Sequence, residues 1–202
     1  MRRQASRIGI FLGCFLLWRP AAAQLPPLET RALVVGVSDY PRLPGLEPAP
    51  FADRDAIAFA DYLVQSGQVT GAGDLVTLIN EQATIEEVMT QLLLLKHEVA
   101  GRSLQRQRVV LFFAGHSLVE GDNPDGGNVT LLLSDTPENW YWNHALRLQD
   151  LQGIVAALSV EYGVEVLLYL DVAHAPEKAM RERIGRQLHT QFSHEVKLIS
   201  AF

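Results

Sequence analysis

The sequence predicts one α/β domain whose mostly parallel central sheet has helices on both faces and a hairpin at one side. Short, almost continuously apolar segments alternate with longer amphipathic segments, which is the pattern of buried parallel strands and the helices that connect them. The 202 residues are 48 % hydrophobic and 20 % charged, a balance typical of a globular domain. No internal repeat or low-complexity segment divides the chain. We therefore expect a single domain over residues 31–202.

The first 23 residues have the three parts of a secretory signal peptide. Met1–Arg7 is basic, Ile8–Trp18 is apolar, and Ala21–Ala23 supplies the small residues of a cleavage site. The apolar run is shorter than the roughly 20 residues that a helix needs to span a bilayer. We expect cleavage between Ala23 and Gln24, a secreted or periplasmic protein without a membrane span, and a short lead-in over residues 24–30.

Charge and cysteine content narrow the function classes. Residues 1–23 hold four arginines and no acidic residue, so of the 17 basic and 23 acidic residues, 13 and 23 remain in the other 179. This acidic body argues against a nucleic acid or an anionic membrane as the partner. The single cysteine, Cys14, lies inside the predicted signal peptide. The mature chain therefore has neither a disulfide nor a cysteine nucleophile.

The first half of the mature chain predicts strand, helix, strand, helix. Residues 32–37 (ALVVGV) form an uninterrupted apolar run, as a buried strand does. Apolar residues at helical spacing predict a helix over 51–65, which ends at a glycine-containing turn. A second apolar run, LVTLI at 75–79, predicts the next strand. The helix expected over 84–99 opens with the Thr-x-x-Glu spacing of a capping box.

The second half continues the alternation after one hairpin. The run RVVLFF predicts a third strand at 108–113, and the turn-rich DNPDGGN segment predicts a hairpin over 118–133. A helix over 148–162 and a strand at 164–170 (VEVLLYL) follow. Pro176 suits the first position of a helix. That helix is expected to reach about Gln191, and a fifth strand follows at 196–200.

The ends of the predicted strands carry the candidate site. In open parallel sheets, ligands bind where the strands reach their carboxyl ends. The third strand ends in FFAGHS with His116, and the fourth ends in LDVAHA with Asp171 and His174. Asp39 follows the first strand. We expect these side chains to meet at one edge of the sheet, with Asp39 and Asp171 as ligand-binding residues.

These segments resemble the caspase-like cysteine peptidases, the family of caspases and metacaspases. FFAGHS is similar to the segment that carries the family's general-base histidine, and LDVAHA to its Asp-x-Cys-His-Ser-Gly segment. ALVVGVSDYPRLPGL, FADRDAIAFADYL (which carries the family's Asp-Ala pair as Asp55-Ala56) and GNVTLLLSD resemble other parts of the family in the same order. The resemblance runs from about Arg31 to Phe202. It implies a three-layer caspase-like fold corresponding to the family's large-subunit portion.

The resemblance also implies roles for individual residues. His116 takes the position of the base, and Asp171 that of an acid holding a basic side chain of the substrate. Ala173 stands at the position of the nucleophile, where a methyl group cannot attack a carbonyl. Two further departures are Ser117 for the family's glycine and Ala175-Pro176 for its Ser-Gly. We therefore expect an inactive, exported caspase-like domain that binds a peptide or protein segment and needs no metal or cofactor.

The family adds a further strand and helix after the fifth strand, and these complete its substrate groove. The resemblance therefore implies that the final strand-helix part is not among these residues. We expect that the sequence is a fragment, that the groove is open, or that a partner completes it.

Three other readings stay open. The chain is an active cysteine-type endopeptidase if its cysteine was replaced by Ala173 through engineering. A serine hydrolase would need a hydroxyl beside His116, but Ser117 is adjacent in the strand and should face the opposite side, which leaves Ser38. A purely structural role as an assembly module is the third. His116, Asp171 and His174 would also form a workable metal-ligand set, although the family resemblance implies no metal there.

Overall fold

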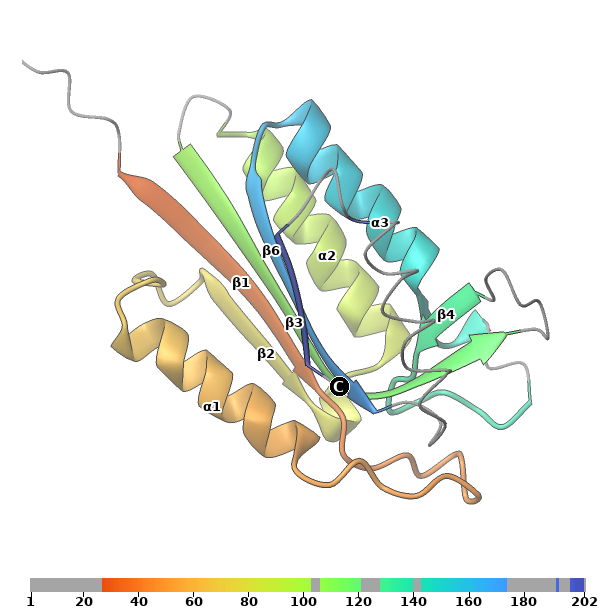
Figure 1. The fold of residues 1–202 in the computed structure, drawn as a ribbon. Helices are drawn as coiled ribbons and strands as arrows, with labels where there is room; N and C mark the ends of the chain where they lie inside the picture. The colour runs from red at the N-terminus through yellow and green to blue at the C-terminus, as the bar shows by residue number, and fades with distance from the viewer. Residues whose placement is uncertain are drawn as a thin grey trace, which may run out of the picture.

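The computed structural model describes residues 27–102, 106–120, 128–139, 143–173, 192 and 197–201. The predicted signal peptide, its cleavage site, most of the lead-in and the predicted helix over 176–191 lie outside these described residues. The expected α/β class is confirmed (Figure 1). Among the described residues, no helix combines the length and the apolarity needed to cross a bilayer.

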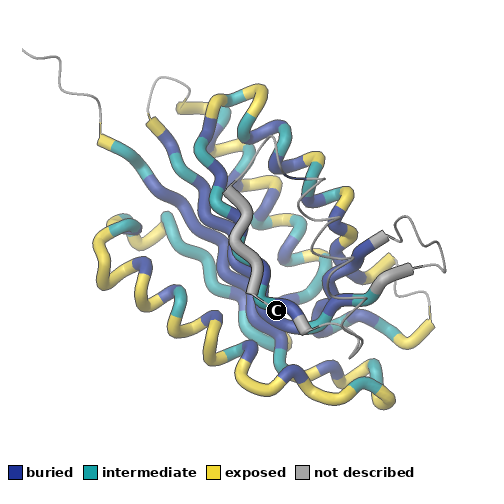
Figure 2. Tube along the Cα trace, in the orientation of Figure 1, coloured by how far each residue is buried: buried dark blue, intermediate teal, exposed yellow. Residues whose placement is uncertain are grey.

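In the part of the chain that the structure describes, five strands form the central sheet, and all of them run parallel (Figure 1). Their order across the sheet is β2 (Leu75–Ile79), β1 (Leu28–Gly36), β3 (Arg106–Glu120), β6 (Glu165–Ala173) and β7 (Lys197–Ala201). Because the strands are parallel, their carboxyl ends lie at one edge, which we call the carboxyl edge. The sheet lies between helices, so β1 and most of β3 are buried on both faces (Figure 2).

The expected hairpin is present, but its first arm belongs to a longer strand. The last residues of β3, from Ser117, pair antiparallel with β4 (Asn128–Leu131). β5 (Leu146–Arg147) then pairs antiparallel with β4. The predicted third strand and the first arm of the hairpin are therefore one continuous strand. Gly115, at a φ of 152°, lies just before the antiparallel part.

Helices cover the two faces of the sheet (Figure 1). α1 (Ala52–Gln65) lies on one face, and α2 (Ile85–Ala100) and α3 (Leu148–Ala156) lie on the other. α3 continues as a π-helical turn, η3 (Ala157–Glu161). The predicted cap of α2 is present, since Thr84 Oγ1 accepts a hydrogen bond of 3.2 Å from the N–H of Glu87.

Close contact between α1 and β1 depends on small residues. A Cβ at Gly36 would lie 2.5 Å from the Cβ of Ala56 and 2.7 Å from the carbonyl oxygen of Ala52. A side chain at position 36 would therefore push α1 away from the sheet. This contact fixes the N-terminal turn of α1 against the last residue of β1, at the carboxyl edge.

An aromatic cluster identifies which strand residues face α1. The ring of Phe59 in α1 stacks on Phe112 of β3 at 4.4 Å between ring centres and packs against Tyr169 of β6 at 4.9 Å. Phe112 and Tyr169 are register partners. Because successive strand residues alternate between faces, Ala114 and Asp171, two residues further along, also lie on the α1 side.

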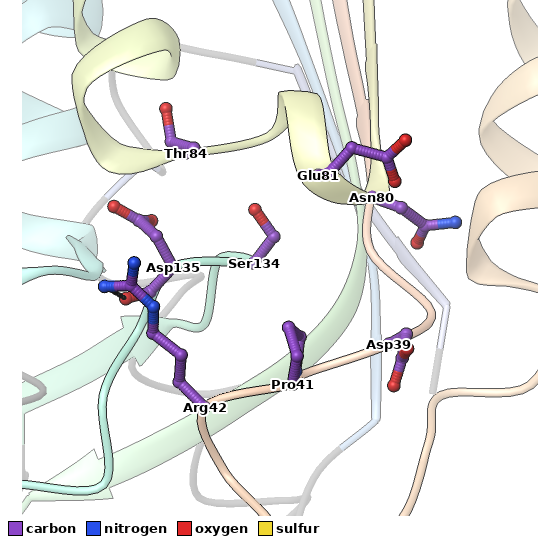
Figure 3. Close-up of a pocket in the computed structure, with 8 residues that line it drawn as sticks. All are labelled: Asp39, Pro41, Arg42, Asn80, Glu81, Thr84, Ser134 and Asp135. Atoms are coloured by element: carbon purple, nitrogen blue, oxygen red, sulfur yellow. Dashed lines mark hydrogen bonds between the residues drawn. The ribbon is translucent and has the colours of Figure 1, made fainter.

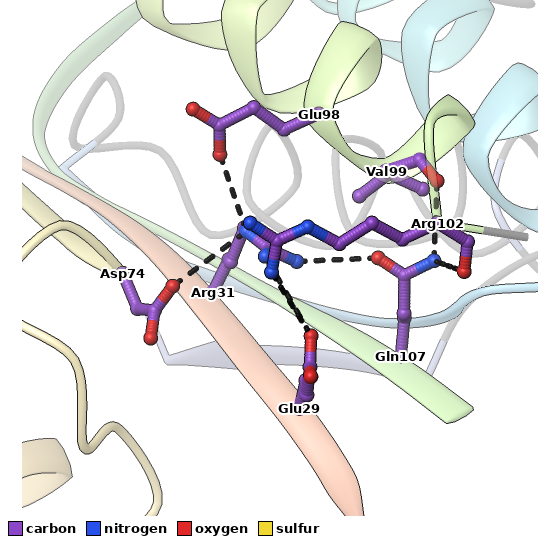
Figure 4. Close-up of polar contacts among 7 residues, drawn as sticks. All are labelled: Glu29, Arg31, Asp74, Glu98, Val99, Arg102 and Gln107. Atoms are coloured by element: carbon purple, nitrogen blue, oxygen red, sulfur yellow. Dashed lines mark hydrogen bonds and ion pairs between the residues drawn. The ribbon is translucent and has the colours of Figure 1, made fainter. Parts of the chain in front are cut away.

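A buried arginine ties the elements together at the opposite edge (Figure 4). The Arg31 side chain is 4 % exposed and lies among acidic groups from α2, from β1 itself and from the turn before β2. These are Glu98 at 3.2 Å and Glu29 and Asp74 at 3.7 Å. Arg31 also donates to Gln107 Oε1 at 3.2 Å, and the Gln107 amide donates to the carbonyls of Val99 and Arg102. The network connects β1 and β3 to the end of α2.

Candidate functional site

His116 is held at the carboxyl edge by a backbone carbonyl. Its Nε2 atom lies 2.8 Å from the carbonyl oxygen of Glu47, in the connection between β1 and α1. Because a carbonyl only accepts hydrogen bonds, this contact requires the proton on Nε2. In the neutral imidazole, Nδ1 is then the unprotonated nitrogen. The tautomer that the Glu47 carbonyl selects therefore leaves Nδ1 able to accept a proton.

A second contact fixes the backbone of His116. The buried hydroxyl of Tyr40 accepts a 2.7 Å hydrogen bond from the His116 N–H and donates a 3.1 Å hydrogen bond to the carbonyl of Val37. Burial raises the pKa of Tyr40 above its usual range, so the phenol remains a donor. A Cβ at Gly115 would lie 2.6 Å from this hydroxyl. The glycine of FFAGHS therefore makes room for the Tyr40 bridge.

Ala173 lies beside His116 in the sheet. The two residues are register partners on the neighbouring parallel strands β6 and β3. Neighbouring strands are about 4.8 Å apart, so the backbone at position 173 lies next to the histidine. The strands that carry His116 and Asp171 are neighbours and end at the same edge, as the strand-end argument expects. His174 lies outside the described residues.

Asp171 is a half-buried carboxyl group on the same face as α1. Burial raises its pKa, and the negative charge of Asp55 in α1 raises it further. Within the described part of the chain, the Asp171 carboxylate has no side-chain hydrogen bond or ion pair, although its backbone belongs to the ladders with β3 and β7. Asp171 and Asp55, which we call the carboxyl pair, therefore form an electrostatically unfavourable arrangement that a bound cation would relieve.

The sequence does not predict the electrostatic effect of Asp55 on Asp171. The Asp-Ala pair in FADRDAIAFADYL marked it as part of a resemblance, but nothing in the sequence alone connected it to Asp171. The connection depends on the packing of α1 against β1 through Gly36 and Ala56.

Ser38 positions the start of α1. Its hydroxyl accepts a 2.9 Å hydrogen bond from the N–H of Asp53 and donates a 2.7 Å hydrogen bond to the Asp53 carboxylate. The hydroxyl's hydrogen bond lowers the pKa of Asp53. The Ser38 N–H in turn donates to Asn80 Oδ1 at 2.8 Å. The Ser38 proton is directed at a carboxylate and not at an imidazole, so these contacts do not support serine catalysis.

Asp39 lies with a different set of residues from Asp171. It is exposed and lines a cavity of about 320 Å³ beside the start of α2 (Figure 3). The other lining residues are Pro41, Arg42, Asn80, Glu81, Thr84, Ser134 and Asp135. Asp135 Oδ1 accepts a 3.0 Å hydrogen bond from the N–H of Ile85 and so caps α2. Asp39 therefore shares a cavity with Asp135, whereas the charge that acts on Asp171 is that of Asp55.

A metal centre is not formed by the residues that the structure describes. Among them, no three His, Cys, Asp or Glu side chains gather closely enough to hold an ion.

Comparisons with known proteins give the fold alone. No protein-family model matches the chain, and no curated protein sequence matches it. Among solved structures, the crystal structure of protein GSU0716 from Geobacter sulfurreducens is similar to it, with a TM-score of 0.51 and 17 % sequence identity. The similarity covers 85 % of this chain and 72 % of the Geobacter protein. At this identity, it supports the overall fold and carries no information about activity.

Proposed function

We propose that the chain is a caspase-like domain that lacks the nucleophile and binds a peptide or protein segment through a basic side chain. The observation that carries this proposal is the carboxyl pair, Asp55 and Asp171, beside the position where His116 and Ala173 are register partners. A half-buried acid, Asp171, whose pKa is raised further by the charge of the exposed Asp55 favours a cationic ligand.

The arrangement of His116 supports a retained peptidase site. A general base needs a fixed orientation and an unprotonated nitrogen. The Glu47 carbonyl orients the ring and the Tyr40 hydroxyl fixes the backbone. What is absent is a group to activate, because Ala173 has no nucleophilic atom and the one cysteine of the chain is Cys14. We propose that the site binds a substrate-like segment without cleaving it.

The charge at the carboxyl pair supports a basic side chain as the bound group. An arginine or lysine would form charge-assisted hydrogen bonds with Asp171 and lower its pKa. The same cation would reduce the repulsion between Asp171 and Asp55. Neutral side chains would gain neither interaction.

An alternative is an active cysteine peptidase whose cysteine was replaced by Ala173. The intact support of His116 by Tyr40 and Glu47 favours this reading over general decay of the site. Both readings place the same segment in the same site, and the native codon at position 173 separates them. We also propose export by the predicted signal peptide and completion of the groove by a partner or a further segment.

Calorimetric titration with two matched peptides tests the proposal. One peptide carries a single arginine, and the other carries citrulline, which has nearly the same shape and no charge. We expect the arginine peptide to bind and the citrulline peptide to bind at least tenfold more weakly, as loss of charge-assisted hydrogen bonds costs about 1.5–3 kcal/mol each.

Three variants locate the binding site. Asp171→Asn and Asp55→Asn should each weaken binding of the arginine peptide about tenfold, because each removes one of the two negative charges. Asp61→Asn, an exposed acid on the same helix, is the matched control and should leave binding unchanged. Equal binding of both peptides, or no effect of Asp171→Asn, contradicts the proposal and favours a purely structural role.

A further inference from the structure

Phe51 adopts a backbone conformation that its side chain disfavours. The residue immediately precedes α1 and has a φ of 78° and a ψ of −5°, in the left-handed region. Phenylalanine rarely adopts this region, which suits glycine or asparagine. The ring is also 57 % exposed, so its burial contributes little to stability in return. Backbone strain of this kind clusters at active sites and ligand-binding segments.

The exposed ring already holds a guanidinium group. The Cζ atom of Arg54 lies 5.4 Å from the centre of the Phe51 ring. At this distance the positive charge is attracted to the electron-rich face of the ring. The planar guanidinium of arginine stacks on such a face better than the compact ammonium of lysine. Phe51 is therefore an accessible surface that accepts arginine.

Phe51 lies one helical turn from the carboxyl pair. Its carbonyl accepts a 2.8 Å hydrogen bond from the N–H of Asp55, the residue that raises the pKa of Asp171. The turn that holds both residues is at the carboxyl edge, where β1, β3 and β6 end (Figure 1). The first turn of α1 therefore carries both the exposed Phe51 ring and the acid whose charge acts on Asp171.

We propose that Phe51 is a stacking platform for the guanidinium of a bound arginine side chain, which gives the site a preference for arginine over lysine. Arg54 occupies the ring in the unliganded protein, and the ligand displaces it. This inference rests on the proposed function, since it specifies the ligand of the same site. It assigns to Phe51 a specificity role that explains both its strain and its exposure.

The test compares arginine, lysine and citrulline peptides on variants at position 51. Phe51→Gly and Phe51→Ala both remove the ring, whereas only glycine relieves the left-handed strain. Both variants should weaken binding of the arginine peptide about three- to fivefold, as expected for loss of one exposed cation–π contact. Binding of the lysine peptide should change less than about twofold. Phe51→Trp should retain binding. Tyr62→Ala, which removes another exposed aromatic ring from α1, is the matched control.

Thermal unfolding of the same variants separates a ligand role from a packing role. Phe51→Gly should raise the melting temperature by about 2–5 °C, and Phe51→Ala should not raise it. Unchanged arginine selectivity in both ring-deleted variants, or a lower melting temperature for Phe51→Gly, overturns the role of Phe51. Failure of the unmodified protein to distinguish arginine from citrulline would instead overturn the proposed function.

Discussion

His116 and Ala173 are register partners on neighbouring parallel strands, although their motifs are far apart in the sequence. The pairing follows from the way β3 and β6 run side by side, with Phe113 beside Leu170 and Gly115 beside Val172. The histidine of FFAGHS and the alanine of LDVAHA therefore reach the carboxyl edge together. Position 173 is therefore a backbone neighbour of His116.

Loss of the Tyr40 hydroxyl should weaken the support of His116. Tyr40→Phe leaves the N–H of His116 and the carbonyl of Val37 without their shared partner. We expect a loss of about 1–3 kcal/mol in the free energy of unfolding, measured with urea, because a partly buried donor and a buried acceptor lose their hydrogen-bond partner. The amide hydrogen of His116 should also exchange faster. Tyr62→Phe, at an exposed tyrosine, is the control; equal behaviour of both variants would contradict the bridge.

Removal of the Ser38 hydroxyl should destabilise α1 in a pH-dependent way. Ser38→Ala deletes both hydrogen bonds with Asp53 and should cost about 1 kcal/mol at neutral pH, as for other helix caps. The pKa of Asp53 is lowered in the folded state, so its contribution is present above the unfolded pKa and is lost as pH falls through the folded pKa.

Urea titrations of the Ser38→Ala variant across the acid range check this sign. The stability difference from the unmodified protein should shrink towards low pH. Ser66→Ala, at the other end of α1, should show no such pH dependence. A difference that stays constant with pH would rule out the coupling between Ser38 and Asp53.

Asp171→Asn should stabilise the unliganded protein most at neutral pH. The pKa of Asp171 is raised in the folded state, so its contribution to stability is present below the unfolded pKa and is lost as pH rises through the folded pKa. Asparagine does not titrate. The stability of the variant relative to the unmodified protein should therefore increase from about pH 3 to pH 7, and the opposite trend would mean that a cation of the protein already neutralises Asp171.

The buried Arg31 should contribute more to the free energy of unfolding than the exposed Arg102. Arg31→Met removes a side chain that is 4 % exposed and leaves Gln107 Oε1 without a donor, so we expect a loss of about 3 kcal/mol. Arg102→Met removes an exposed arginine that pairs with Glu29 and should cost less than about 1 kcal/mol. If both variants lost the same free energy of unfolding in urea, burial of Arg31 would not explain its contribution.

Much of the fold was predictable because apolar runs define strands directly. The strand at 75–79 has the predicted bounds, and the helices predicted over 51–65 and 84–99 differ from α1 and α2 by one residue at their ends. β3 is longer than predicted because FFAGHS continues without a turn into the arm that pairs with β4. Apolar periodicity does not show that an extended segment carries two kinds of pairing.

The candidate site was predictable only as far as strand ends determine it. The rule that parallel strands end at one edge predicted that the strands carrying His116 and Asp171 end together, whereas position 173 was singled out only by the family resemblance. The Glu47 carbonyl was not predictable, because its contact with His116 depends on the path of the connection between β1 and α1. The pairing of Asp171 with Asp55, and the separate place of Asp39, depend on how α1 and α2 pack on the sheet.

Hydrolysis of fluorogenic peptides that end in arginine or lysine tests whether the site beside His116 lacks only its nucleophile. The mature protein is compared with its Ala173→Cys variant, and Ala173→Cys/His116→Gln is the control for the base. The account predicts that the unmodified protein is silent, that Ala173→Cys cleaves, and that the control does not. Cleavage by the unmodified protein would contradict the loss of the nucleophile, and silence of Ala173→Cys would contradict the retained site beside His116.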